Sequence, residues 1–187
     1  MTAEGESDTI NSERERGTKM SIPVEIERKF VIVMPDFKLL ASQSDYTVSE
    51  IDQTYLKSSA LLTHRVRARR TGGATAYTET KKVRIDRMSV YEDEREICEA
   101  EYKELLAEIM PSTVTLRKTR HTFSYLGHTL EIDVYPNWQR SCVLEIELSG
   151  REEEVGIPDF ITVIAEVTGD KKYSNASMSA SFPKELI

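Results

Sequence analysis

Acidic and basic side chains recur at every second position in several short segments of this 187-residue chain. Near the N-terminus, Glu25, Glu27 and Lys29 stand at alternate positions, with Ile26 and Phe30 at the other phase. Because side chains of a β-strand alternate between its two faces, a strand here would place two carboxylates and an ammonium group on one face. Such a face is expected if it looks into a polar cavity that holds a metal ion and an anion.

The same spacing recurs in five further segments, each carrying residues of a single charge sign. They are Arg65, Arg67 and Arg69; Lys118 and Arg120; Glu94 and Glu96; Glu131 and Asp133; and Glu145 and Glu147. An antiparallel sheet with one solvated face would explain any single pair. Surface ion pairs contribute little stability, however, so the segregation of acidic and basic rows favours two ligands of opposite charge.

The basic residues are candidates for binding phosphate, because Arg offers a bidentate fork and Lys a point charge. Three residues on one strand face span about 13 Å at a rise of about 3.3 Å per residue, which suits a chain of linked phosphates. Carboxylates and phosphate oxygens are hard ligands, so they favour Mg²⁺ or Mn²⁺ over zinc. The three histidines are scattered, and Cys98 and Cys142 have no metal-binding spacing.

Periodicity and turn residues predict an α+β fold in which a short helical turn at Asp36–Ala41 and a helix at Glu99–Ile109 flank a sheet. Further short helices are expected from Pro158 to Thr162, extending to Ala165, and at Ser174–Ala180. Leu144, Ile146 and Leu148 form a core-facing row, and Trp138 is expected in a loop at the surface. The predicted strands cover 23–33, 46–57, 61–71, 75–85, 88–97, 113–125, 129–135 and 141–149.

Eight successive antiparallel strands with charged inner faces predict a closed β-barrel, a tunnel with room for one small ligand. Like-charged rows cannot pack together in a dry interior, so water, ions and a ligand must fill such a barrel. Gly72-Gly73 predicts a tight hairpin between two of the strands.

Composition indicates one compact domain at 22–187, preceded by a disordered leader at 1–21 that is rich in Glu, Ser, Thr and Arg. The formal net charge of -7 argues against nonspecific nucleic-acid binding. The chain has no apolar run long enough to span a membrane and no signal peptide. Two cysteines without a disulfide framework predict a cytoplasmic protein, and we expect a monomer or a homodimer.

In their order along the chain, these motifs resemble the CYTH superfamily, also called triphosphate tunnel metalloenzymes, over about residues 22–183. The matches begin with the family hallmark Glu-x-Glu-x-Lys at Glu25–Lys29. They continue with Gln53–Leu56, Arg65–Arg67, Thr78–Lys82, Glu94–Glu96, Lys118–Arg120, Glu131–Tyr135, Glu145–Glu147 and Glu166–Asn175.

The resemblance implies an eight-stranded tunnel that binds a triphosphate-containing small molecule together with Mg²⁺ or Mn²⁺. It implies catalytic roles for Lys29, Lys118 and Arg120. The implied substrate-binding residues are Tyr55, Arg65, Arg67, Lys81, Lys82 and Lys172. The implied metal ligands are Glu25, Glu27, Glu94, Glu96, Asp133, Glu145 and Glu147.

Two of these assignments involve neighbouring lysines. Strand alternation puts Lys82 on the face of Thr78 and Thr80, and Lys81 on the other face, so either could point inward. Lys172 is preferred to Lys171 because family members place a basic residue directly before the following tyrosine.

The resemblance is greatest to the inorganic tripolyphosphatase branch. It implies metal-dependent hydrolysis of a phosphoanhydride bond in inorganic tripolyphosphate or in an organic triphosphate. The alternatives are an adenylate cyclase of the class IV type and a non-catalytic sensor that binds a nucleotide or polyphosphate.

Overall fold

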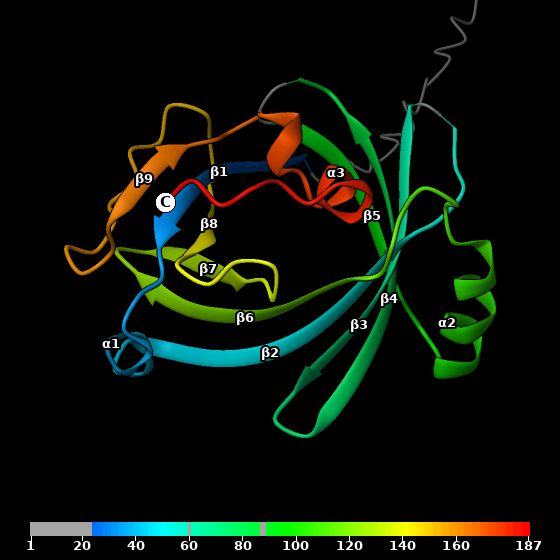
Figure 1. The fold of residues 1–187 in the computed structure, drawn as a ribbon, viewed down its shortest axis with the longest axis horizontal. Helices are drawn as coiled ribbons and strands as arrows, with labels where there is room; N and C mark the ends of the chain where they lie inside the picture. The colour runs from blue at the N-terminus through cyan, green and yellow to red at the C-terminus, as the bar shows by residue number, and fades with distance from the viewer. Residues whose placement is uncertain (1–23, 60, 87–88) are drawn as a thin grey trace, which may run out of the picture.

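The computed structural model describes residues 24–59, 61–86 and 89–187, without the side chains of residues 24, 25, 89 and 90. The predicted leader at 1–21 lies outside the described residues. The helical elements are α1 (Phe37–Ala41), α2 (Glu99–Leu105), α3 (Asn175–Ala180), and the 3₁₀ turns η1 (Leu106–Glu108) and η2 (Lys171–Tyr173). The strands are β1 (Val24–Val33), β2 (Ser44–Tyr55), β3 (Leu62–Thr71), β4 (Ala74–Arg84), β5 (Ser89–Ile97), β6 (Leu116–Tyr125), β7 (His128–Val134), β8 (Ser141–Glu147) and β9 (Val163–Glu166) (Figure 1).

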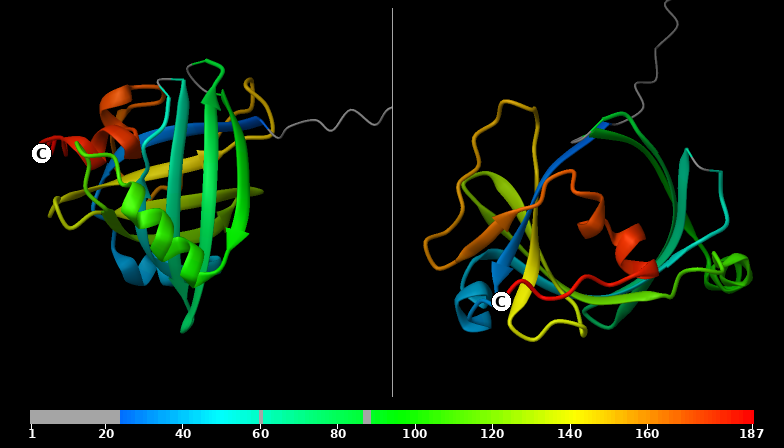
Figure 2. Two further views of the ribbon diagram at one scale, coloured as in Figure 1. Left: turned by 90° about the vertical axis from the view of Figure 1, so that its right-hand side faces the viewer. Right: turned by 45° about the horizontal axis from the view of Figure 1, so that its top comes forward.

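The described strands form one nine-stranded sheet in the order β5-β4-β3-β2-β6-β7-β8-β1-β9, and its pairings are antiparallel. β8 pairs with β1 from Glu27 to Val33. The other edge of β1 is shared, because β5 pairs with Val24–Ile26 and β9 pairs with Phe30–Ile32. The strands therefore curve around a common axis (Figure 2), and β5 meets β1 over only three residue pairs.

The expected α+β class with a mostly antiparallel sheet is confirmed, but the predicted eight-stranded closed barrel is confirmed only in part, because the described sheet has nine strands and β5 meets β1 over only three residue pairs. The ninth strand, β9, lies where a short helix was expected from Pro158 to Ala165. Val163 and Ile164 are β-branched and favour a strand. Hydrogen bonds continue the contact with β1 on both sides of β9, from Val33 N to Thr162 O at 2.9 Å and from Val167 N to Lys29 O at 2.8 Å.

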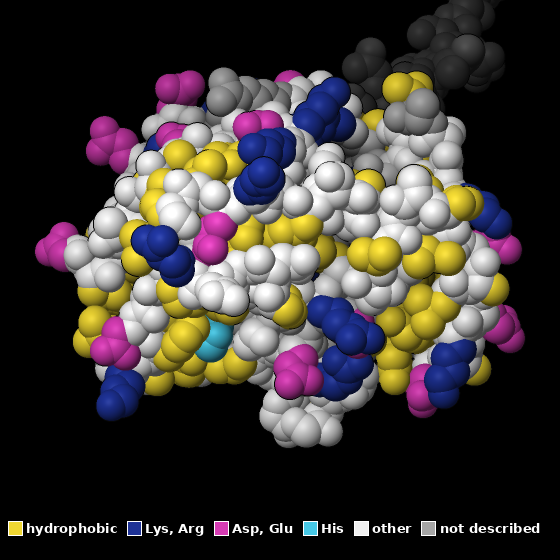
Figure 3. Space-filling view, in the orientation of Figure 1, with side chains coloured by type: hydrophobic (Ala, Val, Ile, Leu, Met, Phe, Trp, Pro, Cys, Tyr) yellow, Lys and Arg dark blue, Asp and Glu magenta, His cyan; other side chains and the backbone are white. Residues whose placement is uncertain are grey.

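The main hydrophobic core lies on the outer face of β6, β7, β8 and β1. The predicted row Leu144, Ile146 and Leu148 is buried there and packs with Phe123 and with Leu40 from α1. Charged rows on the same strands then point to the opposite, inner face. On the molecular face seen in Figure 3, basic and acidic side chains are interspersed with hydrophobic ones.

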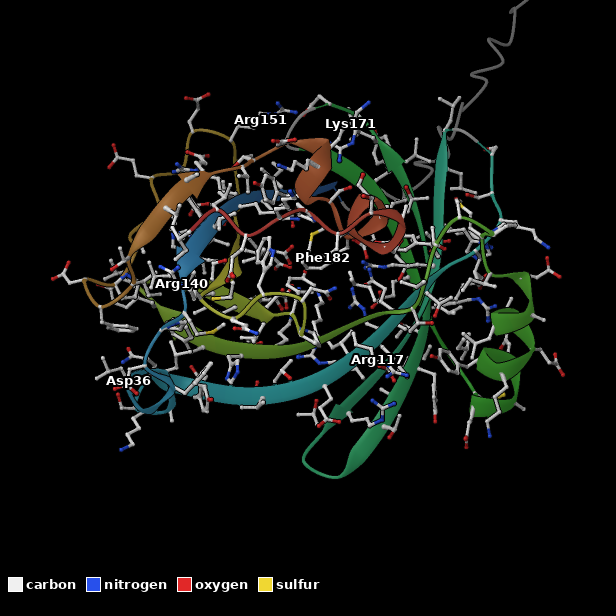
Figure 4. The ribbon with its side chains drawn as sticks, in the orientation of Figure 1. Asp36, Arg117, Arg140, Arg151, Lys171 and Phe182 are labelled. Carbon is white, nitrogen blue, oxygen red and sulfur yellow. The ribbon has the colours of Figure 1, made fainter. Side chains whose placement is uncertain are left out.

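A second hydrophobic cluster fills one end of the inner space. Val31 and Val143 continue the inner rows of β1 and β8, and they pack with residues from η2 and α3. Trp138, expected at the surface, is 4% exposed in this cluster, and its Nε1 donates to the carbonyl of Pro183 at 2.9 Å. Phe182, labelled in Figure 4, packs edge-on against the Trp138 ring. The C-terminal segment covers Trp138. The loop sequence before Trp138 gives no sign of this contact, so a surface position was expected for Trp138.

A third cluster joins α2 to the outer face of β3 and β4. Tyr102 on α2 packs with Val66 and Ala68, and its ring lies 4.9 Å from that of Tyr77. The β3–β4 turn at Gly72-Gly73 has positive φ at both positions, as the predicted hairpin requires. Among the described residues, no helix combines the length and apolar character needed to cross a membrane.

An ion network on the outer face of β3, β4 and β5 centres on Glu79, which is buried. His64 Nε2 lies 2.7 Å from one Glu79 oxygen, and Arg95 Nε donates to the other at 2.6 Å. Burial alone would raise the pKa of Glu79, but the hydrogen bonds from His64 and Arg95 outweigh it and lower that pKa.

We predict that Glu79→Gln lowers the free energy of unfolding by about 1–3 kcal/mol at pH 7, because the ionised group loses its hydrogen-bonded partners. A carboxylate with a lowered folded-state pKa stabilises above its unfolded pKa, and this stabilisation is lost as pH falls through the folded value. The difference from the wild type should therefore shrink below about pH 4 in urea unfolding. Glu104→Gln, at an exposed position of α2, is the control and should unfold as the wild type does. If Glu79→Gln differed from the wild type by the same free energy of unfolding at pH 7 and at low pH, the prediction would be contradicted.

Candidate active site

The inner face of the sheet borders a cavity of about 810 Å³. β3 and β4 supply five basic side chains to its wall, which are Arg65, Arg67, Arg69, Lys82 and Arg84. Strands β1, β5, β7 and β8 supply six acidic ones, which are Glu27, Glu92, Glu94, Glu131, Glu145 and Glu147. Lys29 from β1 and Arg120 from β6 complete the charged wall, and residues from 167 to 177 border it from the C-terminal side.

Arg120 lies at the centre of a buried ion cluster. Its guanidinium donates to both oxygens of Asp133 at 2.7 Å and to Glu145 at 2.7 Å, and it also pairs with Glu131. Asp133 additionally accepts from Lys118, and both of these side chains are fully buried. Burial opposes the charged form of Arg120, but attraction to Asp133, Glu145 and Glu131 outweighs it and raises the pKa.

The pKa shifts of the neighbouring groups follow from the same geometry. Burial would raise the pKa of Glu145, but attraction to Lys29, Lys118 and Arg120 holds it well below its usual range. Lys29 Nζ lies 2.8 Å from Glu145, and this contact and Glu27 raise the pKa of Lys29 despite burial. Burial and repulsion from Arg120 lower the pKa of Lys118 to about 8, although Asp133 and Glu145 act in the opposite direction.

A second charged group lies across the cavity. Arg65 donates to Gln53 Oε1 at 3.1 Å and to Glu92 at 3.2 Å, and Glu92 also pairs with Lys82. Tyr55 is buried beside them, and its hydroxyl accepts from Gln53 at 2.7 Å. The carboxylate of Glu92 thus occupies donors that an anionic ligand would use.

Arg67 differs from the other central cations because it forms no ion pair with a described carboxylate. It donates to Gln53 Oε1 at 3.3 Å, and its Nε is buried without a hydrogen-bond partner. Burial and repulsion from Arg65 and Arg120 lower the pKa of Arg67 to about 10. A half-buried cation with a buried, unbonded Nε is expected to attract an anion.

The structure brings ten of the sequence-predicted site residues to the cavity wall. They are Glu27, Lys29, Tyr55, Arg65, Arg67, Lys82, Glu94, Arg120, Glu145 and Glu147. Lys118 and Asp133 lie behind the wall, where Asp133 accepts hydrogen bonds from both Lys118 and Arg120. The side chain of Glu25 lies outside the described residues.

Three predicted residues lie away from the cavity wall. Lys81 is exposed on the outer face, 3.5 Å from Glu79, because strand alternation turns Lys82 inward. Lys172 is exposed and its Nζ lies over the ring of Tyr173, whereas Lys171 on η2 borders the cavity (Figure 4). Glu96 is exposed near the end of β5.

Six charged wall residues were missing from the predicted set: Arg69, Arg84, Glu92, Glu131, Asp170 and Lys171. Alternation could have found four of them, because Arg69, Arg84, Glu92 and Glu131 share strand faces with residues that were chosen. Lys171 lies on a 3₁₀ turn, where alternation does not apply. No group of three or more His, Cys, Asp or Glu in the described part of the chain is arranged to hold a metal ion by itself.

Comparisons with known proteins give matches among solved structures. A search with family models and a search of curated proteins each found no match. The inorganic triphosphatase NE1496 matches with a TM-score of 0.54 and 25% identity, over 86% of this chain and 97% of that chain. Another structure of NE1496, described as a hypothetical protein, gives a TM-score of 0.53 and 25% identity over 85% and 99%.

This likeness to a triphosphatase structure supports the CYTH superfamily that the sequence motifs indicate. The recognition of that superfamily from the sequence motifs is therefore confirmed. PH1819 from Pyrococcus horikoshii OT3 shares the fold, with a TM-score of 0.54 and 22% identity over 69% of this chain and 80% of that chain.

We predict that Asp133→Asn lowers the free energy of unfolding by about 3–5 kcal/mol, because Lys118 and Arg120 would remain buried with less compensating charge. Urea unfolding measures the change. Glu131→Gln is the matched control, since Glu131 also pairs with Arg120 but is more exposed than Asp133. An equal loss of unfolding free energy in both variants would contradict the prediction that the buried pairing at Asp133 contributes more to stability than the pairing at Glu131.

Proposed function

We propose that this protein is a divalent-metal-dependent triphosphatase, which hydrolyses a phosphoanhydride bond of inorganic tripolyphosphate or of an organic triphosphate in the cavity bordered by β1–β8. One observation carries the proposal: cations from four strands converge with carboxylates on a single cavity. The likeness to the inorganic triphosphatase NE1496 over most of both chains supports it.

In the proposed reaction, the basic side chains hold the phosphate groups and stabilise the charge that develops during transfer. Arg65 and Arg67 share Gln53 Oε1 as an acceptor, so their guanidinium groups are already oriented before a ligand binds. Fixed charges of this kind stabilise a transition state without reorganisation at the moment of reaction. Asp133 acts from behind the wall by holding Arg120 in place, and Lys118 pairs with the same carboxylate.

The donor set fits a hard divalent cation. Glu27 on β1 is directly opposite Glu147 on β8, and like charges in that position repel. Lys29 Nζ lies 3.4 Å from Glu27 and offsets part of this repulsion, and a divalent cation would offset more of it. Mg²⁺ is commonly bound by one or two carboxylates together with substrate phosphates, so a site without three clustered ligands is compatible with it. Glu27 and Glu147 would hold the ion with help from Glu145, and Mg²⁺ or Mn²⁺ would neutralise phosphate charge there.

The remaining parts of the proposal rest on the sequence. The cavity is a tunnel walled by β1–β8, with β9 outside it, and the catalytic unit is a monomer or a homodimer. Cys98 and Cys142 are both free thiols, which agrees with action in the cytoplasm.

The test is turnover of tripolyphosphate, ATP, GTP and thiamine triphosphate with Mg²⁺ or Mn²⁺, with orthophosphate, pyrophosphate and cyclic nucleotide measured separately. We expect orthophosphate release. Pyrophosphate with cyclic AMP would identify a cyclase instead, and binding without any product would identify a sensor.

Arg65→Ala should lower the rate of phosphate release by about 10²–10³-fold, which is the usual effect of removing one preorganised donor. Arg70→Ala is the control, because Arg70 is exposed on the opposite face of the same strand and pairs with Asp52. Near-normal turnover by Arg65→Ala, with its fold intact, would remove Arg65 from the phosphate site.

Tripolyphosphate with Mg²⁺ should raise the melting temperature, because a ligand that binds only the folded state stabilises it by mass action. Glu27→Gln should require a higher Mg²⁺ concentration to reach half of the Mg²⁺-dependent part of that rise, since it removes one carboxylate charge. Glu152→Gln, at an exposed position outside the cavity wall, should behave as the wild type. An unchanged Mg²⁺ titration in Glu27→Gln would contradict its role as a metal ligand.

A further inference from the structure

The cations of β3 and β4 extend along the cavity beyond the length of a triphosphate. We propose that Arg69 and Arg84, at the two ends of this row, bind phosphates beyond the third, so that the site takes linear polyphosphates longer than tripolyphosphate. This inference rests on the proposed function, and it names the substrate class more closely.

The register of β3 and β4 sets the length of the row. Arg69 is paired with Ala76 on β4, and Arg84 lies eight residues further along that strand. At a rise of about 3.3 Å per residue, the two ends are about 26 Å apart along the strands. The phosphorus atoms of a triphosphate are joined only through two bridging oxygens, so a triphosphate spans a few bond lengths and covers a fraction of the row.

Cations occur at regular intervals between these ends. Strand pairing places Lys82 beside Thr63, two residues before Arg65 on β3. Arg84, Lys82, Arg65, Arg67 and Arg69 therefore lie at successive two-residue steps, and all five border the same cavity. Regular spacing of this kind matches a polymer with one negative charge or more on each repeating unit.

The end residues are suited to bind a ligand. Arg69 donates through Nε to Ser49 Oγ at 3.0 Å, and it forms no ion pair with a carboxylate in the described part of the chain. Further along the row, Arg67 and Arg65 each have a buried Nε without a hydrogen-bond partner. Arg84 is exposed at the end of β4 and donates to the carbonyl of Asp86, a contact from the adjacent turn. Together they extend the cationic surface at both ends of the central Arg65.

The wall favours more phosphate over an organic group as the extension. A nucleobase is usually held by stacking on an aromatic side chain. Tyr55 is the one aromatic residue on the cavity wall in the described ranges, and it is buried with its hydroxyl bonded to Gln53. The rest of the row presents guanidinium and ammonium groups, which recognise phosphate oxygens.

The experiment measures binding of tripolyphosphate and of a longer linear polyphosphate by calorimetry, with EDTA present so that hydrolysis is suppressed. Hydrogen bonds to charged groups contribute about 1.5–3 kcal/mol, so the longer chain should bind at least about tenfold more tightly to the wild type. In the double variant Arg69→Ala/Arg84→Ala, the ratio of the two affinities should fall about tenfold or more. Arg84→Ala alone should lower this ratio by less than the double variant does. Because Arg84 is exposed, this single variant is the test if the double variant does not fold.

The matched control is Lys81→Ala/Arg70→Ala, which also removes two cations from β3 and β4 but on the outer face. It should keep the wild-type ratio, which separates contacts along the row from general attraction to a polyanion. A wild-type ratio near one, or a ratio that survives in the Arg69 and Arg84 variants, would overturn the inference while tripolyphosphate turnover still stands. If the wild type neither binds nor hydrolyses tripolyphosphate, both the proposed function and this inference fail.

Discussion

The structure depends on matching the charges that line its interior. A buried charge without a partner is very costly, so rows of cations can line an enclosed space only if carboxylates or a ligand compensate them. Asp133 and Glu145 do this for Lys118, Arg120 and Lys29. Glu92 does it for Arg65 and Lys82. Compensation is incomplete at Arg67, and this is where an anion is most strongly favoured.

This constraint also explains where the hydrophobic core lies. Because the inner face is charged, the strands β6, β7, β8 and β1 bury their apolar rows on the outer face, beneath α1. At one end the inner face becomes apolar, where Val31 and Val143 meet Trp138, Tyr173 and Phe182. The cavity is therefore bounded at that end by packed side chains and borders η2 and α3, whose short helical segments lie next to the charged region.

The predictions that succeeded rest on alternation within one strand. Alternation placed Leu144 and Ile146 on the outer face and Glu145 and Glu147 on the inner one, and the structure shows both. It also distinguishes Lys82 from Lys81 once Thr80 is known to face inward. Where side chains do not alternate, the same reasoning has no basis. Lys171 borders the cavity because η2 turns it there, and residues 163–166 form a strand because β1 has a free edge beside them.

The sequence by itself determined the charged rows, the antiparallel strands and the resemblance to the CYTH superfamily, since these follow from residue order and from a side-chain period of two. Only the tertiary structure decided which rows meet and how each charge is compensated. It set Glu27 opposite Glu147 and brought Glu92 to Arg65, and it also covered Trp138 with the C-terminal segment. These contacts join positions far apart along the chain, and their geometry depends on strand register and curvature, which no local pattern encodes.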